Sequence, residues 1–237
     1  MNPIGQIIHT ISYMALPLLL AMVFHEYAHG WVANRYGDST ARLEGRLTLN
    51  PAAHIDPFGT ILLPLLCLIF SSGILLGYAR PVPVNAWNLR NPRRDMALVA
   101  AAGPGMNLLL AIASAVILSV TFAIDPSVVN SLRGSGIRRD LLGMILVPLA
   151  WMCIFSVQIN LVLMVFNLIP IPPLDGGRIM VSLLPPRQAE ALGQLEPYGM
   201  LIIFFLVMID PQIHLLGSLM GPLVNILTTT IISTFTS

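Results

Sequence analysis

Long apolar runs, separated by short polar or Pro/Gly-rich stretches, make up most of this chain of 237 residues. The first run predicts a helix over about residues 11–35, and two later runs predict helices over about 95–123 and 141–168. A short segment and two further apolar runs, which flank Asp210-Pro211, complete the C-terminal part. Several of these runs reach the roughly 20 residues that a helix needs to cross a bilayer.

The region between the first two predicted helices has a different pattern. Its polar part, residues 37–57, alternates in character around Gly45, which predicts a short membrane-associated β-hairpin. An apolar run at 58–77 follows, but Pro64 and the Ser71-Ser72-Gly73 group interrupt it. We therefore expect five to six hydrophobic segments, one of which is broken.

Composition supports a membrane protein, because 56% of the residues are hydrophobic, only 10% are charged and the mean hydropathy is +0.81. Soluble domains carry about 25% charged residues. The fold class expected is an all-α polytopic membrane protein in a lipid bilayer, forming one domain over residues 1–237. A net charge of +1 without a basic cluster predicts no nucleic-acid partner.

The first predicted helix carries three ionisable residues, His25, Glu26 and His29, in the sequence "HEYAH". Residues four apart in a helix lie about 40° apart around its axis, so the two imidazoles share one face. Two such imidazoles can hold one metal ion, and the adjacent glutamate can act on a water bound to it, which is the signature of zinc hydrolases. Pairing of the three groups with polar residues of neighbouring helices is the structural alternative, but ionisable groups inside membrane helices are usually functional.

A zinc hydrolase needs a third protein ligand, and the sequence offers two candidates. Asp175 stands in "PPLDGG", where prolines and glycines end a helix and open the backbone, although Asp before Gly is also common in turns. His54 stands in the Pro-bounded "NPAAHIDPFG", where it can also simply bond to nearby backbone. Spacing alone does not decide between them.

Three separated motifs, "HEYAHG", "AAGPGMN" and "NLIPIPPLDGGR", occur in the order found in the site-2 protease family of intramembrane zinc metalloproteases. The segments "GRLTLNPAAHIDPFGT" and "GYARPVPVN" also resemble the compact bacterial branch of that family, which lacks a PDZ domain. The resemblance extends over about residues 22–178 and implies a catalytic core at about 11–184, followed by C-terminal hydrophobic segments at 197–235.

The resemblance implies an intramembrane endopeptidase that cuts peptide bonds in or near transmembrane segments of protein substrates. It implies one Zn²⁺ per chain held by His25, His29 and Asp175, with Glu26 as the catalytic base. Asn167 matches the family asparagine that holds substrate or stabilises the oxyanion. The "AAGPGMN" segment predicts close helix packing, in which Asn107 can hydrogen-bond across helices. Many relatives cut regulatory or signal-peptide substrates, and this sequence does not indicate which.

Closure of the metal site constrains the topology. If every apolar run crossed the membrane once, His25 and Asp175 would reach opposite faces, so the 58–77 run is predicted to be re-entrant. This topology puts nine arginines on the side of the site and three on the other, against six and six for four full spans. The nine are Arg35, Arg42, Arg46, Arg80, Arg90, Arg93, Arg94, Arg178 and Arg187. Because positive residues favour the cytoplasm, we expect a bacterial inner-membrane protein with its site toward the cytoplasm.

Two other functions compete with the protease. A metal transporter could use His25, His29 and Asp175 as a transit site, but it would need further ligands along a path and the helices offer few. An inactive scaffold is disfavoured because the catalytic set is intact. In the protease interpretation, the predicted strand "ARLEGRLTLN" pairs with an unwound substrate by strand addition.

Overall fold

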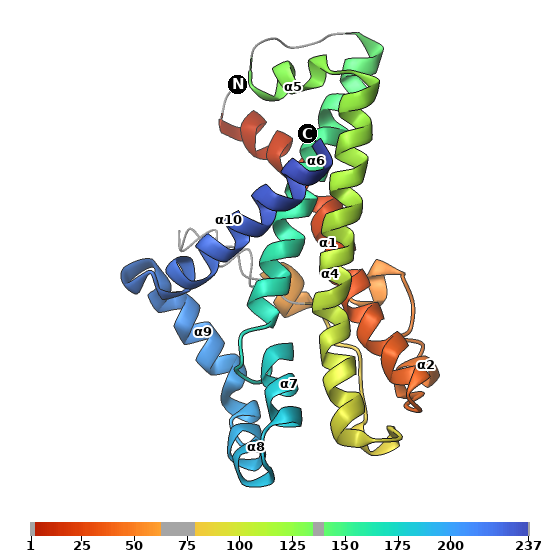
Figure 1. The fold of residues 1–237 in the computed structure, drawn as a ribbon, viewed down its shortest axis with the longest axis vertical. Helices are drawn as coiled ribbons and strands as arrows, with labels where there is room; N and C mark the ends of the chain where they lie inside the picture. Colours follow the sequence, from red (N-terminus) through yellow and green to blue (C-terminus); the bar gives the residue numbers. More distant parts are fainter. Residues whose placement is uncertain (1–2, 63–78, 135–139, 237) are drawn as a thin grey trace.

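The computed structural model describes residues 3–62, 79–134 and 140–236 (Figure 1). All regular structure in these ranges is helical, so the all-α prediction is confirmed for them. The elements in chain order are α1 (Pro3–Arg35), α2 (Thr40–Leu43), η1 (Pro51–Ala53), η2 (Pro57–Leu62), η3 (Ala86–Asn88), α4 (Pro92–Ile124), α5 (Ser127–Leu132), α6 (Leu141–Asn167), α7 (Asp175–Leu183), α8 (Pro186–Gly193), α9 (Glu196–Ile213) and α10 (Leu215–Thr236).

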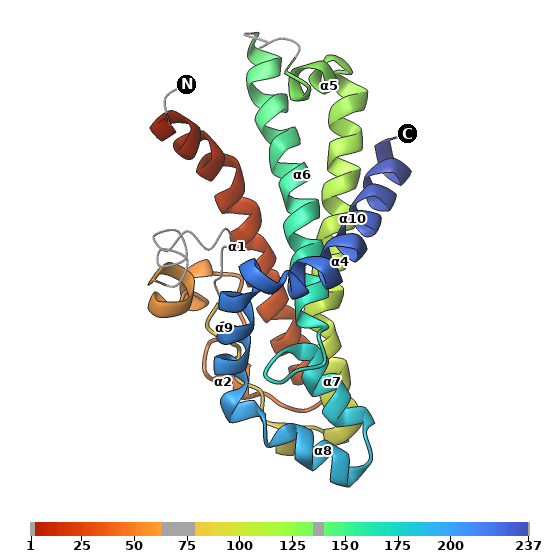
Figure 2. The same cartoon turned by 90° about the vertical axis from the view of Figure 1, so that its left-hand side faces the viewer.

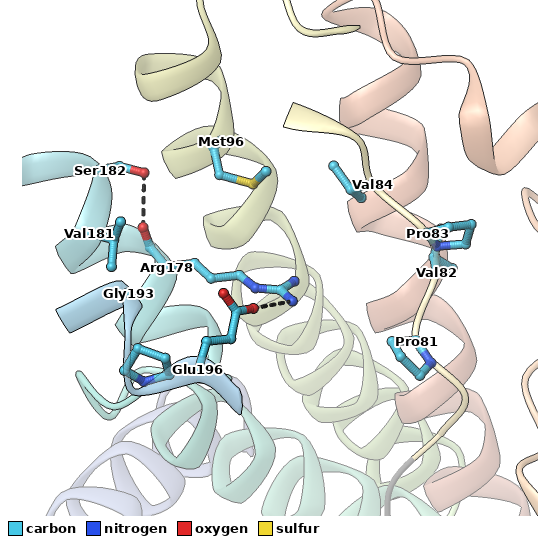
Figure 3. A pocket seen from close by; sticks show the side chains of 11 residues that line it. Pro81, Val82, Pro83, Val84, Met96, Arg178, Val181, Ser182, Gly193 and Glu196 are labelled. Atoms are coloured by element: carbon cyan, nitrogen blue, oxygen red, sulfur yellow. Dashed lines mark hydrogen bonds and ion pairs between the residues drawn. The ribbon is translucent and has the colours of Figure 1, made fainter. Parts of the chain in front are cut away.

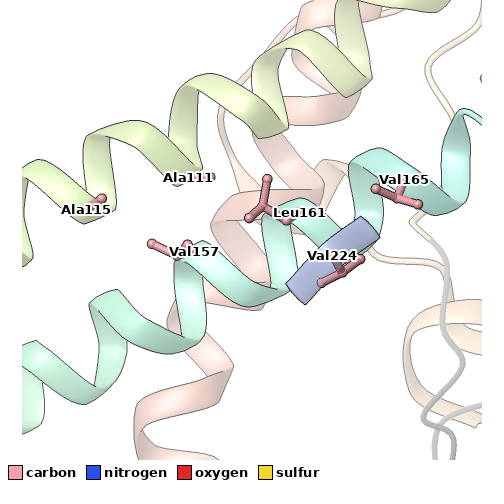
Figure 4. Packing of buried hydrophobic residues seen from close by; sticks show 6 residues of the cluster. All are labelled: Ala111, Ala115, Val157, Leu161, Val165 and Val224. Atoms are coloured by element: carbon pink, nitrogen blue, oxygen red, sulfur yellow. The ribbon is translucent and has the colours of Figure 1, made fainter. Parts of the chain in front are cut away.

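Helices α1, α4 and α6 form the centre of the molecule (Figures 1 and 2). Helices α4 and α6 run antiparallel along much of their lengths, and α1 packs against both of them. Small residues make this packing possible, because Ala111 and Ala115 of α4 lie one turn apart and let the backbone of α6 approach. They form one buried cluster with Val157, Leu161 and Val165 of α6 and Val224 of α10 (Figure 4).

In the described part of the chain three helices are long and apolar enough to cross a membrane, namely α4, α6 and α10, and the bent pair of α8 and α9 could be a fourth. Helix α1 is not among them, and it carries the strongly polar His25, Glu26 and His29. The expected count of five to six hydrophobic segments is therefore not confirmed. Most of the expected re-entrant run at 58–77 lies outside the described residues.

The chain leaves α1 and enters α4 at the same end of the bundle, the end that also carries α2, α7 and α8 (Figure 2). Helix α5, the start of α1 and the end of α10 lie toward the opposite end. Residues on the two sides of the broken apolar run also meet, because the backbone N–H of Arg80 donates to the carbonyl of His54 at 2.8 Å. The re-entrant course of the run between them stays a prediction.

The predicted β-hairpin after α1 is wrong, because the described residues contain no strand. The stretch instead begins with α2, and Gly45 ends that helical turn with a φ of +66°. The N–H of Gly45 donates to the Arg42 carbonyl and the N–H of Arg46 to the Ala41 carbonyl, which is the pattern of a Schellman C-cap. The alternation of polar and apolar residues around Gly45 gave the wrong prediction because this glycine ends a helical turn and does not form the turn of a hairpin.

The C-terminal helices break at His214, and not at Asp210-Pro211 as the sequence suggested. His214 has a left-handed φ of +51°, and α10 begins at the next residue. The side chain of Asp210 accepts the backbone N–H of Leu216 at 2.5 Å, while its carbonyl accepts the N–H of His214. Asp210 thus joins the end of α9 to the first turn of α10, whose unpaired N–H groups favour a carboxylate.

Candidate metal centre

Helix α1 and the first residue of α7 bring three metal-ligand side chains together. His25 and His29 lie one turn apart on α1, with ring centroids 4.7 Å from each other. The carboxylate of Asp175 lies against both rings, at 3.2 Å from His25 Nε2 and 3.3 Å from His29 Nε2. All three residues are buried, and one ligand atom from each lies within 4.8 Å of the other two.

The turn between α6 and α7 delivers the carboxylate. Asp175 is the first residue of α7, and the two glycines that follow it pack directly on the preceding turn. A Cβ on Gly176 would lie 2.2 Å from the carbonyl oxygen of Leu168, and one on Gly177 would lie 2.3 Å from Pro172 N. Only glycine fits at such distances, so the "DGG" sequence lets α7 fold back and holds Asp175 at the histidines.

Helix α4 orients both imidazoles. The Nδ1 atom of His25 lies 2.5 Å from Asn107 Oδ1, and that of His29 lies 2.7 Å from the carbonyl oxygen of Val99. Both partners are acceptors, so each Nδ1 carries a proton, and in the neutral form that binds a metal each Nε2 keeps its lone pair. Partners of this kind fix the orientation of metal-binding histidines. Asn107 thus hydrogen-bonds across helices as the sequence analysis expected.

Between Val99 and Asn107 on the same face of α4 stands Gly103. A Cβ on Gly103 would lie 2.4 Å from His29 Nε2 and 2.6 Å from His25 Nε2. The absence of a side chain at this position therefore makes room for the two ring edges that face the ligand position. The sequence analysis assigned this glycine only to helix packing. Its "AAGPGMN" motif was the available signal, but contact with the histidines required the structure.

The donor set fits a zinc ion. With both Nδ1 atoms protonated, the Nε2 lone pairs of His25 and His29 face each other at 3.1 Å, and the Asp175 carboxylate faces both. Asp175 Oδ2 is buried and accepts no hydrogen bond. Such a convergence of acceptors is repulsive without a cation between them. The 3.1 Å between the two Nε2 atoms is close to the edge of about 3.3 Å in a tetrahedron with zinc–nitrogen distances of about 2.0–2.1 Å. Each nitrogen also has its own Asp175 oxygen, at 3.2 Å from His25 and 3.3 Å from His29.

Glu26 follows His25 on α1, and its carboxylate is held from outside the helix. Its Oε2 accepts the backbone N–H of Val82 at 2.8 Å. Val82 belongs to the extended segment at residues 81–84, between the broken apolar run and η3. This contact was not foreseen from the sequence, because it joins a side chain to a backbone group 56 positions away.

A cleft of about 580 Å³ lies beside this segment (Figure 3). Residues 81–84 form one wall and α7 forms the facing wall, with Met96 of α4 between them. Pro172, from the turn before Asp175, also lines the cleft. Arg178 of α7 and Glu196 of α9, which form an ion pair of 3.2 Å, also line the cleft (Figure 3). The cleft therefore adjoins both the segment that holds Glu26 and the turn that delivers Asp175.

Asp38 holds the C-terminal end of the segment at residues 81–84. This fully buried carboxylate accepts the backbone N–H of Asn85 at 2.7 Å, the side-chain amide of Asn88 at 3.0 Å and two bonds from Thr40. Burial alone would raise the pKa of Asp38, but these hydrogen bonds hold the pKa below its ordinary value. The loop after α1 and the turn before α4 are thereby tied together.

The other two sequence candidates lie outside the cluster. His54 is buried, and its Nε2 lies 2.8 Å from the carbonyl oxygen of Thr48, which is the backbone contact considered as its alternative. It does not belong to the metal-ligand group found among the described residues. Asn167 is the last residue of α6, and its amide donates to the Leu163 carbonyl at 3.0 Å. Its proposed contact with substrate stays a prediction.

Comparison with known proteins gives a consistent result. Peptidase family M50 matches residues 13–210. The "Putative zinc metalloprotease YwhC" of Bacillus subtilis is 38% identical over 218 residues, which cover 91% of this chain and 87% of that protein. The "Putative zinc metalloprotease Rip2" of Mycobacterium tuberculosis is 29% identical over 190 residues, covering 80% of this chain and 63% of that protein. No solved structure matches the chain.

Proposed function

The chain belongs to peptidase family M50, and we propose that it is an intramembrane endopeptidase that hydrolyses peptide bonds in or near transmembrane segments of proteins. It is a zinc metallopeptidase and an integral membrane protein. The observation that carries the proposal is the convergence of His25, His29 and Asp175 next to α4, a helix long and apolar enough to span a membrane and hydrogen-bonded to both histidines.

In this proposal His25, His29 and Asp175 would hold one zinc ion per chain, and the ion would also bind a water. Bound zinc would lower the pKa of that water toward about 7 and polarise the scissile carbonyl. Glu26 accepts the proton of the water and passes it to the leaving amine. The bond from the Val82 N–H supports this role, because it holds one oxygen of the carboxylate and leaves the other available among the described residues to take the proton.

We assign the substrate to the cleft between residues 81–84 and α7. A helical peptide hides its carbonyls in hydrogen bonds, so the segment to be cut must be extended. The cleft has an extended wall next to Glu26, which suits such a segment, and it replaces the predicted hairpin as the candidate surface for substrate pairing. Asn167 is proposed to hold the substrate or to stabilise the oxyanion.

The proposed location is the bacterial inner membrane, with the centre toward the cytoplasm. Arg42 on α2, Arg178 on α7 and Arg187 on α8 belong to elements at the end of the bundle where the chain leaves α1. Arg133 follows α5 at the opposite end. This distribution agrees with the nine-to-three division of arginines and with the preference of positive residues for the cytoplasm. We further propose that residues 1–237 form one domain with its catalytic core at about 11–184.

Replacement of Glu26 by Gln tests the mechanism. Glutamine keeps the size of the side chain and can still accept the Val82 N–H, but it cannot take a proton. We expect near-normal zinc content, with cleavage lowered by about 10²–10⁴-fold, as is usual when a general base is lost. Purified parent and variant would each be reconstituted with bacterial membrane proteins, and new peptide termini would be counted by mass spectrometry.

Glu44→Gln is the matched control, since Glu44 is an exposed glutamate at the end of α2 and should leave cleavage unchanged. A metal transporter would instead show zinc flux that depends on Glu26 and no new peptide termini. Equal numbers of new termini from the parent and from Glu26→Gln would contradict the protease mechanism.

A further inference from the structure

A chain of buried polar side chains runs from the metal centre into the packing between α4 and α6. Asn107 and Asn160 are 0% and 1% exposed, although both lie on helices that are candidate membrane spans. Asn107 Oδ1 contacts His25 Nδ1 at 2.5 Å, and Asn107 Nδ2 donates to Asn160 Oδ1 at 2.8 Å. Asn160 Nδ2 in turn donates to the backbone carbonyl of Ser156 at 2.9 Å.

Backbone carbonyl groups determine the direction of the hydrogen bonds in this network of polar side chains. An amide side chain can present either its oxygen or its NH₂ group to a neighbour, and only its partners determine which one it presents. The carbonyl of Ser156 can only accept, so Asn160 turns its NH₂ to Ser156 and its oxygen to Asn107. The carbonyl of Ala21, 3.3 Å from Asn107 Nδ2, likewise accepts only. Asn107 therefore presents its oxygen to His25.

This polarity has a consequence for His25. Facing an oxygen, its Nδ1 must carry the proton, and its Nε2 keeps the lone pair that a metal ion needs. His29 needs no such arrangement, because its Nδ1 contacts the Val99 carbonyl, whose polarity is fixed. The two histidines thus reach the same tautomer by different means, one through the backbone and one through a pair of asparagines.

We propose that Asn107, oriented by Asn160, is a positioning residue that fixes the tautomer and ring orientation of His25 for metal binding. This inference rests on the proposed metal site. Interhelical hydrogen bonds can also serve only to hold membrane helices together. A purely structural pair would affect stability alone, whereas a positioning pair sets zinc affinity and the protonation pattern of the His25 ring.

The test uses the full chain purified in detergent. Zinc affinity is measured by competition with a chelator, the His25 tautomer by ¹⁵N NMR of labelled histidine, and metal-free stability by thermal unfolding. Asn107→Ala should weaken zinc binding by about 10–100-fold, the usual effect of losing such a partner. Asn160→Ala should also weaken zinc binding, but less strongly, because the Ala21 carbonyl still accepts from Asn107. Since Asn107 loses its bond to Asn160, its amide can turn, and a mixture of His25 tautomers is expected.

Asn107→Asp keeps an oxygen toward His25 and should therefore bind zinc more tightly than Asn107→Ala. Its second oxygen meets the acceptors Asn160 Oδ1 and Ala21 O in place of the lost NH₂ group, so the recovery should be partial. Ser114→Ala is the matched control. It removes the 2.8 Å bond from Ser114 to Ser156 at the outer end of the network but leaves the Ser156 carbonyl in place. We expect it to leave zinc affinity and the His25 tautomer unchanged.

Zinc affinity of folded Asn107→Ala within twofold of the parent, or an equal loss in Ser114→Ala, would overturn the inference. If Asn107→Ala fails to fold, the test rests on Asn160→Ala. The inference is then overturned if Asn160→Ala has the zinc affinity of the parent and shows the same single His25 tautomer. If His25→Ala binds zinc as tightly as the parent, the proposed metal site is overturned together with this inference. A parent site that depends on His25 but not on Asn107 or Asn160 would overturn this inference alone.

Discussion

A single methyl group at Gly103 should weaken zinc binding without replacing any of the ligand residues. In Gly103→Ala the new Cβ would lie 2.4 Å from His29 Nε2 and 2.6 Å from His25 Nε2. Ordinary contacts of a Cβ begin at 3.4 Å, so the two ring nitrogens must retreat by about 1.0 Å and 0.8 Å respectively. Metal–ligand distances tolerate only about 0.2 Å. The required movement is therefore four to five times larger than the site accepts.

The rings cannot retreat freely, because His25 is held by Asn107 and His29 by the Val99 carbonyl. Rotation of the rings must break these bonds, or α4 must move away from α1. Small-to-large substitutions in packed interiors cost about 1–3 kcal/mol. If that strain falls on the metal-bound state, zinc affinity drops by about 5–150-fold, since each 1.4 kcal/mol is a factor of ten. The metal-free protein can relax the rings and should remain folded.

Gly105→Ala is a close control. Gly105 lies two residues further along α4, and no atom lies within 4 Å of a Cβ placed on it. This change should leave zinc affinity unaltered and should favour the helix by about 0.5–1 kcal/mol. The assay is zinc competition with a chelator, alongside thermal unfolding of both variants. Parental zinc affinity in Gly103→Ala would refute the assigned position of the imidazoles, and an equal loss in Gly105→Ala would refute the steric argument.

Three further outcomes are expected. Metal analysis should show zinc lost in Asp175→Ala and retained in His54→Ala, because only the aspartate lies at the histidine pair; the reverse result would transfer the third ligand to His54. In a cysteine-free background, cysteines at the exposed Leu49 and Trp87 should be labelled from the same side of the membrane, and labelling from opposite sides would rule out the re-entrant run. Asp38→Asn should lower the free energy of unfolding by roughly 1–3 kcal/mol at pH 7, because hydrogen bonds to a charged group are weakened. Since the native pKa of Asp38 is lowered, this contribution is present above about pH 4 and is lost as the pH falls through the native value, so the unfolding temperatures of parent and variant should converge in acid. A gap in unfolding temperature that does not change with pH would contradict the role of the Asp38 charge.

The sequence predicted the helices well where periodicity and length agreed. Helices α4 and α6 begin and end within about three residues of the ranges expected from the apolar runs. It failed after α1, where alternation suggested a hairpin but local hydrogen bonds formed a helical turn ended by Gly45. Alternation predicts a strand only when a partner strand is present to pair with it, and the described residues provide none there.

The sequence by itself determined that His25 and His29 share one helix face and that Glu26 lies beside them, because helix geometry depends only on spacing. It also determined that the chain is largely apolar, and thus its environment. The tertiary structure decided which distant groups meet that face: Asp175 rather than His54 at the imidazoles, Gly103 against their edges and Asn107 behind His25. These groups are 70 or more positions away from the histidines they contact, so their approach depends on how the helices pack, which no local pattern encodes.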